Sequence, residues 1–124
     1  MPPIMKAYFT RDSVCADDDG DAPHPREADL PDGLTLHQLV CAVVVAADLP
    51  SITGGRATWC VSSALPLAVI AQQWPEPRFL AFIPPKLSEL DVSSQTIRLH
   101  FTYFDQQDPD AVYDVLRRLR LRAE

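Results

Sequence analysis

Motifs for catalysis and cofactor binding are missing from this sequence. Only four of its 124 residues are glycine, and its three cysteines and three histidines form no C-x-x-C or H-x-x-x-H pair. A structural zinc site is therefore not expected. The turn Gly54-Gly55-Arg56 offers backbone N–H groups to a phosphate, but a Gly-Gly pair is far more often an ordinary turn, and no nucleophile with its base is recognisable. We predict a protein that is not an enzyme and that binds no metal and no cofactor.

Long apolar runs are missing as well. No run is long enough to span a bilayer, and the first residues lack the cationic and apolar regions of a secretory signal. The cysteines are odd in number, and Cys41 and Cys60 lie inside apolar runs, which is typical of packed, inert thiols in a reducing compartment. We therefore expect a cytoplasmic protein that makes no membrane contact.

Positive charge is scarce. Eleven Lys and Arg residues against seventeen Asp and Glu give a net charge of −6, which disfavours nucleic acid as a partner. The negative charge is concentrated in residues 12–32, which carry eight acidic residues and one basic residue, whereas the rest of the chain sums to +1. Residues 17–27 also hold a glycine and two prolines and almost nothing apolar, so we expect an exposed loop.

Two charged clusters have simple explanations. The acidic run at residues 17–21 suggests calcium ligands. However, with Gly20 at the sixth position of an EF-hand loop the twelfth position is Arg26, where a bidentate Glu is required, so we expect a solvated acidic loop. The four arginines between residues 117 and 122 lie at the end of a predicted helix, where they complement the helix dipole, so they do not require a nucleic-acid site.

The start of each predicted helix is marked by capping residues. Thr35 with Gln38 forms a capping box, and Leu34 and Leu39 stand at the hydrophobic staple positions. Apolar residues then recur at helical spacing until Pro50, which ends the helix region. A second amphipathic helix begins with Asp108 as cap and Pro109 at the first helical position.

Alternation and β-branched content predict the strands. The expected strands cover residues 4–10, 57–63, 67–74, 79–83 and 97–104, with a loop of about four residues between the second and the third. The last of them has the clearest period of two. We therefore predict one α+β domain over residues 1–124, in which an antiparallel or mixed sheet of four to five strands packs against two amphipathic helices.

A partner-binding surface is the best candidate for function. The proline-bounded acidic loop supplies a charged rim, and tryptophans near predicted strand ends supply large anchors. The alternative for each tryptophan is a place in the core. The predicted binding residues are Asp17, Asp18, Asp19, Asp21, Glu27, Trp59 and Trp74.

The segments Tyr8–Val14, Gly54–Trp59 and Ala71–Trp74 match no enzyme motif, and they look like fixed points of a small bacterial family. In size, acidity, lack of catalytic motifs and α+β order, the whole chain resembles the immunity proteins of contact-dependent and polymorphic toxin systems. These are cytoplasmic antidotes with diverse folds, so the resemblance assigns no role to single residues. It implies that the chain neutralises a cognate, basic toxin domain by occluding its active site or an exosite.

Two other hypotheses belong to different classes. The chain can be a small ligand-binding or enzymatic α+β domain with a pocket near His37, His100 and Trp74. It can also be a structural subunit of a larger assembly, in which case the acidic loop is incidental.

Overall fold

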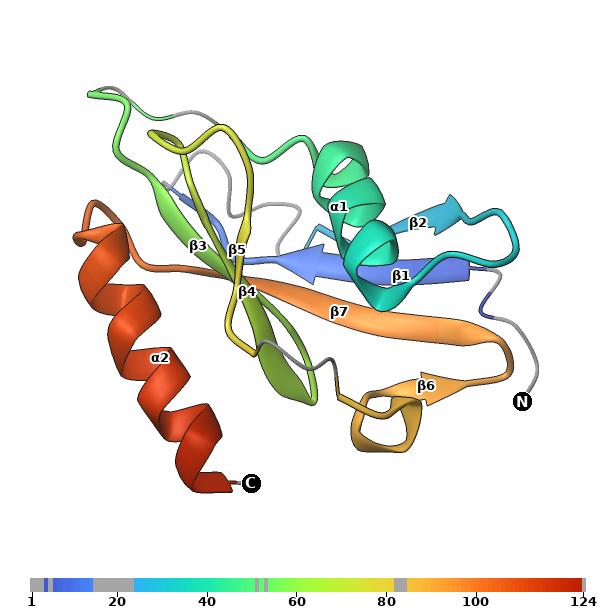
Figure 1. Ribbon diagram of the computed structural model, residues 1–124. Coiled ribbons are helices and arrows are strands. Elements are labelled where there is room, and N and C mark those ends of the chain that lie inside the picture. The colour runs from blue at the N-terminus through green and yellow to red at the C-terminus, as the bar shows by residue number, and fades with distance from the viewer. Residues whose placement is uncertain are drawn as a thin grey trace.

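The computed structural model describes residues 4, 6–14, 24–50, 52, 54–81 and 85–123, and of residues 120–123 only the backbone. From the N-terminus to the C-terminus (Figure 1), its elements are β1 (Lys6–Arg11), β2 (Arg26–Asp29), α1 (Leu36–Ala47), β3 (Thr58–Ser63), β4 (Leu65–Ala71), β5 (Arg78–Phe79), the short 3-10 helix η2 (Leu87–Glu89), β6 (Val92–Ser93), β7 (Thr96–Tyr103) and α2 (Pro109–Ala123).

The strands form one mixed sheet of seven, in the order β2-β1-β7-β3-β4-β5, with β6 paired to the end of β7. β1 and β7 are neighbours and pair in parallel although they come from opposite ends of the chain, and every other pair is antiparallel. The α+β class and the mixed sheet are as predicted. The prediction of four to five strands was too low, because it missed β2 and β6.

Helix α1 begins at the predicted capping box. The Gln38 N–H donates to Thr35 Oγ1 at 3.1 Å, and the Thr35 N–H donates to Gln38 Oε1 at 3.0 Å. The helix ends before Pro50, because Asp48 adopts a left-handed backbone conformation with φ 46°. Helix α2 begins as predicted at Pro109, and Asp108 Oδ1 accepts from the Asp110 N–H at 3.1 Å.

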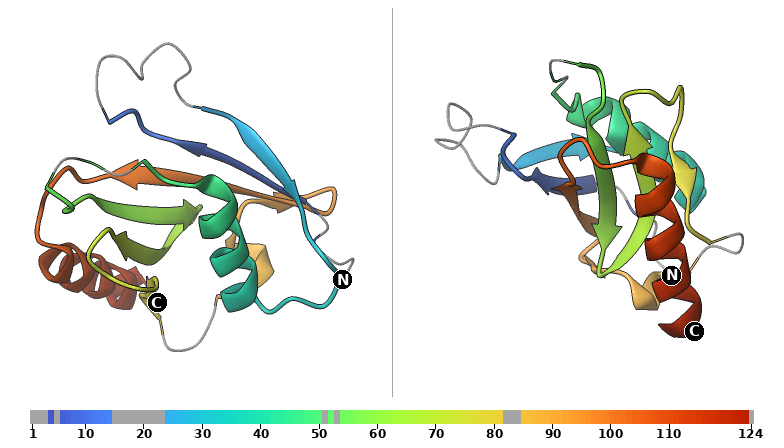
Figure 2. Two further views of the ribbon diagram at one scale, coloured as in Figure 1. Left: turned by 90° about the horizontal axis from the view of Figure 1, so that it is seen from above. Right: turned by 90° about the vertical axis from the view of Figure 1, so that its left-hand side faces the viewer.

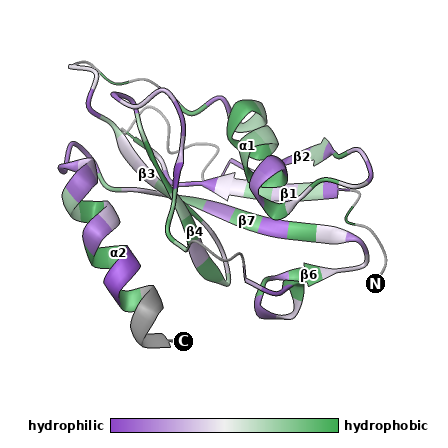
Figure 3. Cartoon of the chain, in the orientation of Figure 1, coloured by the Kyte–Doolittle hydropathy of each residue, from purple (hydrophilic) through white to green (hydrophobic). Residues whose placement is uncertain are grey.

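The main core lies between α1 and one face of the sheet. It contains the buried side of α1, the alternating apolar residues of the central strands, and Trp59, which is 2% exposed. Alternation along β7 is visible in Figure 3: Ile97, Leu99 and Phe101 are buried in this core, and the polar residues between them point to the other face. We call these the α1 face and the second face.

Helix α2 covers only part of the second face. Val112 on α2 packs with Val69 on β4 and Leu80, and Tyr113 on α2 donates from its hydroxyl to the Phe79 carbonyl oxygen at 2.9 Å. Figure 2 shows α2 and the β1–β2 pair at opposite ends of the twisted sheet. Among the described residues, no helix therefore covers the second face over β2, β1 and the neighbouring half of β7.

The hairpin between β3 and β4 is tighter than predicted. Ser63 pairs with Leu65, so Ala64 alone makes the turn, with φ 62°. At a β-bulge between Val61 and Ser62, β4 has one extra residue, Leu67. Both Leu67 and the next residue, Ala68, are therefore buried in the main core. The predicted strand at residues 79–83 is reduced to the two residues of β5, and residues 82–84 lie outside the described residues.

Candidate partner-binding face

The uncovered part of the second face is polar. Strand register decides which side chains share it, because residues paired across strands point to the same side. Tyr8 pairs with Glu27 on one side and with Arg98 on the other, and Thr10 pairs with His100. We define this polar face by Lys6, Tyr8, Thr10, Glu27, Arg98 and His100, all of which are partly or largely exposed.

A hydrogen-bonded chain crosses one end of the polar face. His100 Nδ1 lies 2.6 Å from Thr10 Oγ1, and His100 Nε2 lies 2.8 Å from Asp12 Oδ1. The second carboxylate oxygen of Asp12 accepts from the Tyr103 N–H at 2.9 Å, and the Asp12 N–H donates to the Phe101 carbonyl oxygen at 3.0 Å. Asp12 is the first residue of the acidic region 12–32, which we call the acidic stretch, and it is thus fixed to β7 through its side chain and its backbone.

The hydroxyl, imidazole and carboxylate of this chain are connected as in hydrolytic triads. The His100 ring lies between the two other groups, with Nδ1 next to the Thr10 hydroxyl and Nε2 next to the Asp12 carboxylate. Hydrolysis also needs a substrate cavity and free N–H donors for an oxyanion. Thr10 instead lies inside a paired strand, and the side chains of His100 and Asp12 are 39% and 42% exposed. The geometry supports an anchored polar surface better than a reaction centre.

The charges on the polar face are paired loosely. Lys6 Nζ lies 3.5 Å from Glu27 Oε2, and Arg98 lies 3.9 Å from Asp91 while donating to Ser93 Oγ at 2.7 Å. Ion pairs this exposed add little to stability, because water competes for both partners. They remain available to a charged partner.

An exposed loop was predicted for residues 17–27, and this is wrong for the last two of them, Arg26 and Glu27. Residues 26–29 form β2, so Glu27 lies on an edge strand beside Tyr8. The strand forms because β1 offers an unpaired edge and because Ala28 and Leu30 reach the core. The other predicted acidic residues, Asp17, Asp18, Asp19 and Asp21, lie outside the described residues. Ser13 and His24 lie before and after these residues in the sequence, and their side chains are in contact, with Ser13 Oγ 3.3 Å from His24 Nε2.

The two tryptophans do not join this face. Trp59 packs in the main core against Tyr103, with ring centroids 4.7 Å apart, so the prediction of a surface anchor there is corrected to a core residue. Trp74 is half-buried beside α2, and the Arg78 guanidinium lies 3.9 Å above its ring and pairs with Asp110 at 2.8 Å. Trp59 gains apolar burial in the core, and Trp74 gains partial burial and a cation–π contact with Arg78, which a wet strand surface does not offer.

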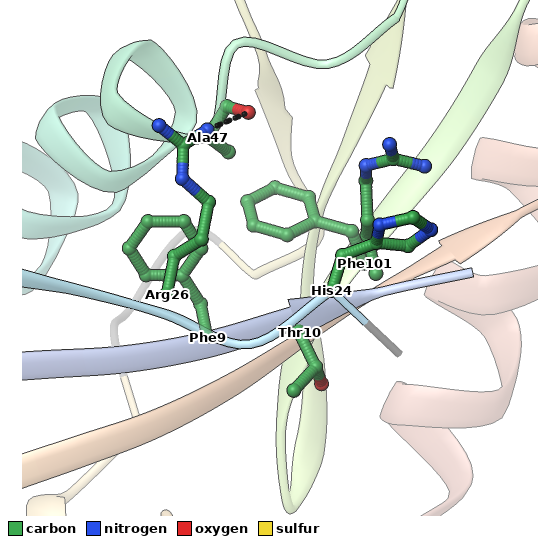
Figure 4. A pocket seen from close by; sticks show the side chains of 7 residues that line it. Phe9, Thr10, His24, Arg26, Ala47 and Phe101 are labelled. Atoms are coloured by element: carbon green, nitrogen blue, oxygen red, sulfur yellow. Dashed lines mark hydrogen bonds between the residues drawn. The ribbon is translucent and has the colours of Figure 1, made fainter. Parts of the chain in front are cut away.

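The residues of the alternative pocket are also separated. His37 on α1 stacks on Phe79 with centroids 4.0 Å apart, whereas His100 points to the second face and Trp74 packs near α2. A different pocket lies on the α1 face, where Arg26 donates to the Ala47 carbonyl oxygen at 3.2 Å (Figure 4). Its volume is about 10 Å³, which is room for about one water molecule, and none of the three predicted residues lines it.

Cys60 is buried as predicted. Burial disfavours its thiolate and raises the pKa of Cys60 to about 11, while the weak hydrogen bond to Ser62 acts in the opposite direction. Burial also raises the pKa of Cys41, with a smaller contribution from Glu76. Within the described part of the chain, no three His, Cys, Asp or Glu side chains gather in a way that suits a metal ion.

None of the described helices combines the length and the apolar character that a membrane span needs.

Sequence reasoning missed the polar face, although part of its signal was visible. Arg98 and His100 alternate with buried residues on the strand that was predicted most clearly, so one polar strand surface was expected. The missing information was the parallel pairing with β1, which brings Thr10 and Asp12 to His100 across about ninety residues of sequence. Comparison of the chain with protein-family models, with curated proteins and with solved structures gives no match.

Proposed function

We propose that this chain is a protein-binding inhibitor of the bacterial cytoplasm, a toxin-neutralising immunity protein whose polar face and acidic stretch together bind a basic toxin domain. The observation that supports the proposal is the position of Asp12. Its contacts with His100 and Tyr103 fix the Asp12 carboxylate at the end of an uncovered polar strand surface. A basic partner that is attracted by the Asp12 carboxylate therefore meets a fixed polar surface beside it.

Charge supports the same partner. The chain carries a net charge of −6, and residues 15–23 alone contain four carboxylates and no Lys or Arg. A concentration of one sign raises the association rate with an oppositely charged protein and suppresses binding to acidic ones. Blocking by surface contact also requires no deep pocket in the inhibitor. The separation of His37, His100 and Trp74 gives the ligand-binding alternative no support.

The test is neutralisation in living cells. The toxic domain of the protein encoded beside this chain's gene is expressed in a bacterial host with and without the chain, and growth is followed. Wild type is expected to restore growth. The acidic-stretch variant, in which four Asp are replaced by Ser, and the polar-face variant Tyr8→Ala/Glu27→Lys are expected to restore it poorly. The four replaced residues are Asp17, Asp18, Asp19 and Asp21.

A matched control has the same net charge as the acidic-stretch variant. It neutralises four carboxylates outside residues 15–23, namely Asp32→Asn, Asp48→Asn, Glu76→Gln and Asp105→Asn, all of which are exposed. The acidic-stretch variant is expected to associate with the purified toxin domain about tenfold more slowly than wild type at low salt, and the control is expected to show a smaller decrease. Equal rescue and equal rates for both variants would reject the role of the acidic stretch, and failure of wild type to restore growth would reject the function.

A further inference from the structure

Strand β2 has one side of its backbone without a partner among the described residues. It is the last strand in the order of the sheet, next to β1, and no described segment pairs with its outer side. The β1–β2 pair forms one end of the sheet (Figure 2). An open strand edge offers N–H and C=O groups with which another extended chain pairs. We call the outer side of Arg26–Asp29 the β2 edge.

The hydrogen bonds of β1 show which backbone groups point toward β2. In a β-strand, the N–H and C=O groups of one residue point to the same neighbouring strand, and those of the next residue point to the other side. The Lys6 N–H donates to the carbonyl oxygen of Gln95, just before β7, at 3.3 Å. The Asp12 N–H donates to the Phe101 carbonyl oxygen on β7 at 3.0 Å. The even-numbered residues of β1 therefore direct these groups to β7, and the odd-numbered residues direct them to β2.

The register between β1 and β2 then identifies the free groups of β2. The odd-numbered residues of β1 lie opposite Arg26 and Ala28, so these two residues direct their backbone groups inward, to β1. The N–H and C=O groups of Glu27 and Asp29 consequently point outward, to the β2 edge. Both of these residues are exposed, and their side chains lie on the second face of the sheet. The residues that offer free backbone groups are thus the two acidic residues of the strand.

The two carboxylates select the kind of chain that pairs with this edge. A strand added to β2 places every second side chain directly beside Glu27 and Asp29, at a Cβ separation of about 4.5–5.5 Å. Lys6 Nζ lies 3.5 Å from Glu27 Oε2, but the Glu27 side chain is still 60% exposed and accessible to a second cation. Lys or Arg at two alternate positions of the added strand is therefore attracted, and Asp or Glu at those positions is repelled.

A second copy of the chain does not fit the β2 edge. Two identical strands pair antiparallel about a two-fold axis perpendicular to the sheet, so the residues opposite each other are both even-numbered or both odd-numbered. Centring the axis on each residue of β2 in turn places Arg26 opposite Arg26, Glu27 opposite Glu27, Glu27 opposite Asp29, or Asp29 opposite Asp29. Like charges directly opposite each other are destabilising. The edge therefore resists pairing with itself but admits a basic strand.

We propose that the β2 edge accepts an extended basic segment of the partner protein as an additional strand, with Lys or Arg at two alternate positions beside Glu27 and Asp29. Main-chain hydrogen bonds to the outward N–H and C=O groups hold the segment, and the carboxylates select its charge and register. The inference rests on the proposed function for the identity of the partner, a basic toxin domain, and adds which part of that partner is bound. The pairing itself is tested with a synthetic peptide.

Amide hydrogen exchange of the labelled full chain measures the pairing. The probe is the acetylated peptide Thr-Val-Lys-Val-Lys-Val-Thr, and the control peptide Thr-Val-Lys-Lys-Val-Val-Thr has the same composition with its lysines on opposite faces. In the free chain, the amides of Glu27 and Asp29 are expected to exchange faster than those of Arg26 and Ala28. The probe is expected to bind with a dissociation constant on the order of 0.1–1 mM and to slow both outward amides about tenfold at saturation. The control peptide is expected to bind about threefold to tenfold more weakly.

A proline variant tests the backbone contact separately from the charge. The Asp29 N–H points away from β1, so Asp29→Pro removes an outward donor and leaves the pairing with β1 intact. Its matched control, Asp29→Asn, loses the same charge but keeps the N–H. Asp29→Pro is expected to bind the probe about fivefold more weakly than Asp29→Asn, and melting temperatures verify that both variants are folded. Glu27→Lys/Asp29→Lys reverses the charge and is expected to bind the peptide Thr-Val-Glu-Val-Glu-Val-Thr, which wild type does not bind.

The results separate the β2 edge from the proposed function. No measurable binding of the probe, equal affinity for the two lysine peptides, or equal affinity of the folded Asp29→Pro and Asp29→Asn variants overturns the proposal, and the proposed function stands if wild type still restores growth. A chain that binds the probe as expected but does not restore growth contradicts the proposed function and leaves the pairing edge supported. A folded Asp29→Pro variant that restores growth as well as Asp29→Asn overturns the assignment of this edge to the toxin.

Discussion

Replacing Asp12 by alanine is expected to lower the free energy of unfolding by about 1–2 kcal/mol. The carboxylate accepts one hydrogen bond from His100 Nε2 at 2.8 Å and one from the Tyr103 N–H at 2.9 Å, and alanine removes both acceptors. Hydrogen bonds to a charged group contribute about 1.5–3 kcal/mol in favourable settings. The side chains of Asp12 and His100 are 42% and 39% exposed, so water replaces part of the loss. In a domain of 124 residues this corresponds to a fall in melting temperature of about 4–8 °C.

Urea unfolding of a double-mutant cycle measures the contact itself. The cycle comprises wild type, Asp12→Ala, His100→Ala and the double variant, and a coupling free energy of about 0.5–1.5 kcal/mol is expected. Asp12→Asn retains an acceptor for the Tyr103 N–H and is expected to lose less than alanine. Asp32→Ala, at an exposed position, serves as the control and is expected to stay within about 0.5 kcal/mol of wild type.

Two results would refute this reasoning. If Asp12→Ala unfolds at the same urea concentration as wild type, the Asp12 carboxylate does not anchor the end of β1 to β7. If the two single variants add within about 0.3 kcal/mol in the double variant, Asp12 and His100 do not act on each other.

Three further changes have defined outcomes. Burial raises the pKa of Cys60 from an ordinary value near 9 to about 11. The unfolded thiol ionises at a lower pH than the folded one, so the contribution of Cys60 to stability is full below about pH 9 and is lost as the pH rises to about 11, by up to about 2–3 kcal/mol. In urea unfolding from pH 8 to 11, the free energy of unfolding is expected to decline less steeply for Cys60→Ala than for wild type. Equal declines would contradict the raised pKa. Thr35→Ala breaks the capping box and is expected to cost about 1 kcal/mol in thermal unfolding, a loss that Thr35→Ser avoids. Arg78→Ala uncovers Trp74 and is expected to increase acrylamide quenching of tryptophan fluorescence, while stability changes by less than about 1 kcal/mol; unchanged quenching would place the guanidinium away from the ring.

Local signals in the sequence were sufficient for the elements that are stabilised locally. The capping box at Thr35, the cap and proline at the start of α2, and the alternation of β7 each involve residues within a few positions of one another. Such patterns fix an element because the interaction and the residues that make it lie in one window.

The missed features depend on partners far away in the sequence. β2 has the sequence Arg-Glu-Ala-Asp, with no alternation to mark a strand, and it forms because β1 provides an edge to pair with. The contact between Thr10 and His100 requires the parallel pairing of β1 and β7, for which no single window carries a signal. Trp59 was ambiguous for the same reason, since its burial depends on which sheet face α1 covers.

The most direct measurement of the proposed binding surface is a map of backbone amide chemical shifts in a labelled chain, recorded as the purified toxin domain is added. The account predicts that the largest shift changes fall in β1, β2, β7 and the part of the acidic stretch between β1 and β2. These changes are expected to be smaller in the acidic-stretch variant. Changes confined to α2, or to the turn around Trp74, would contradict it.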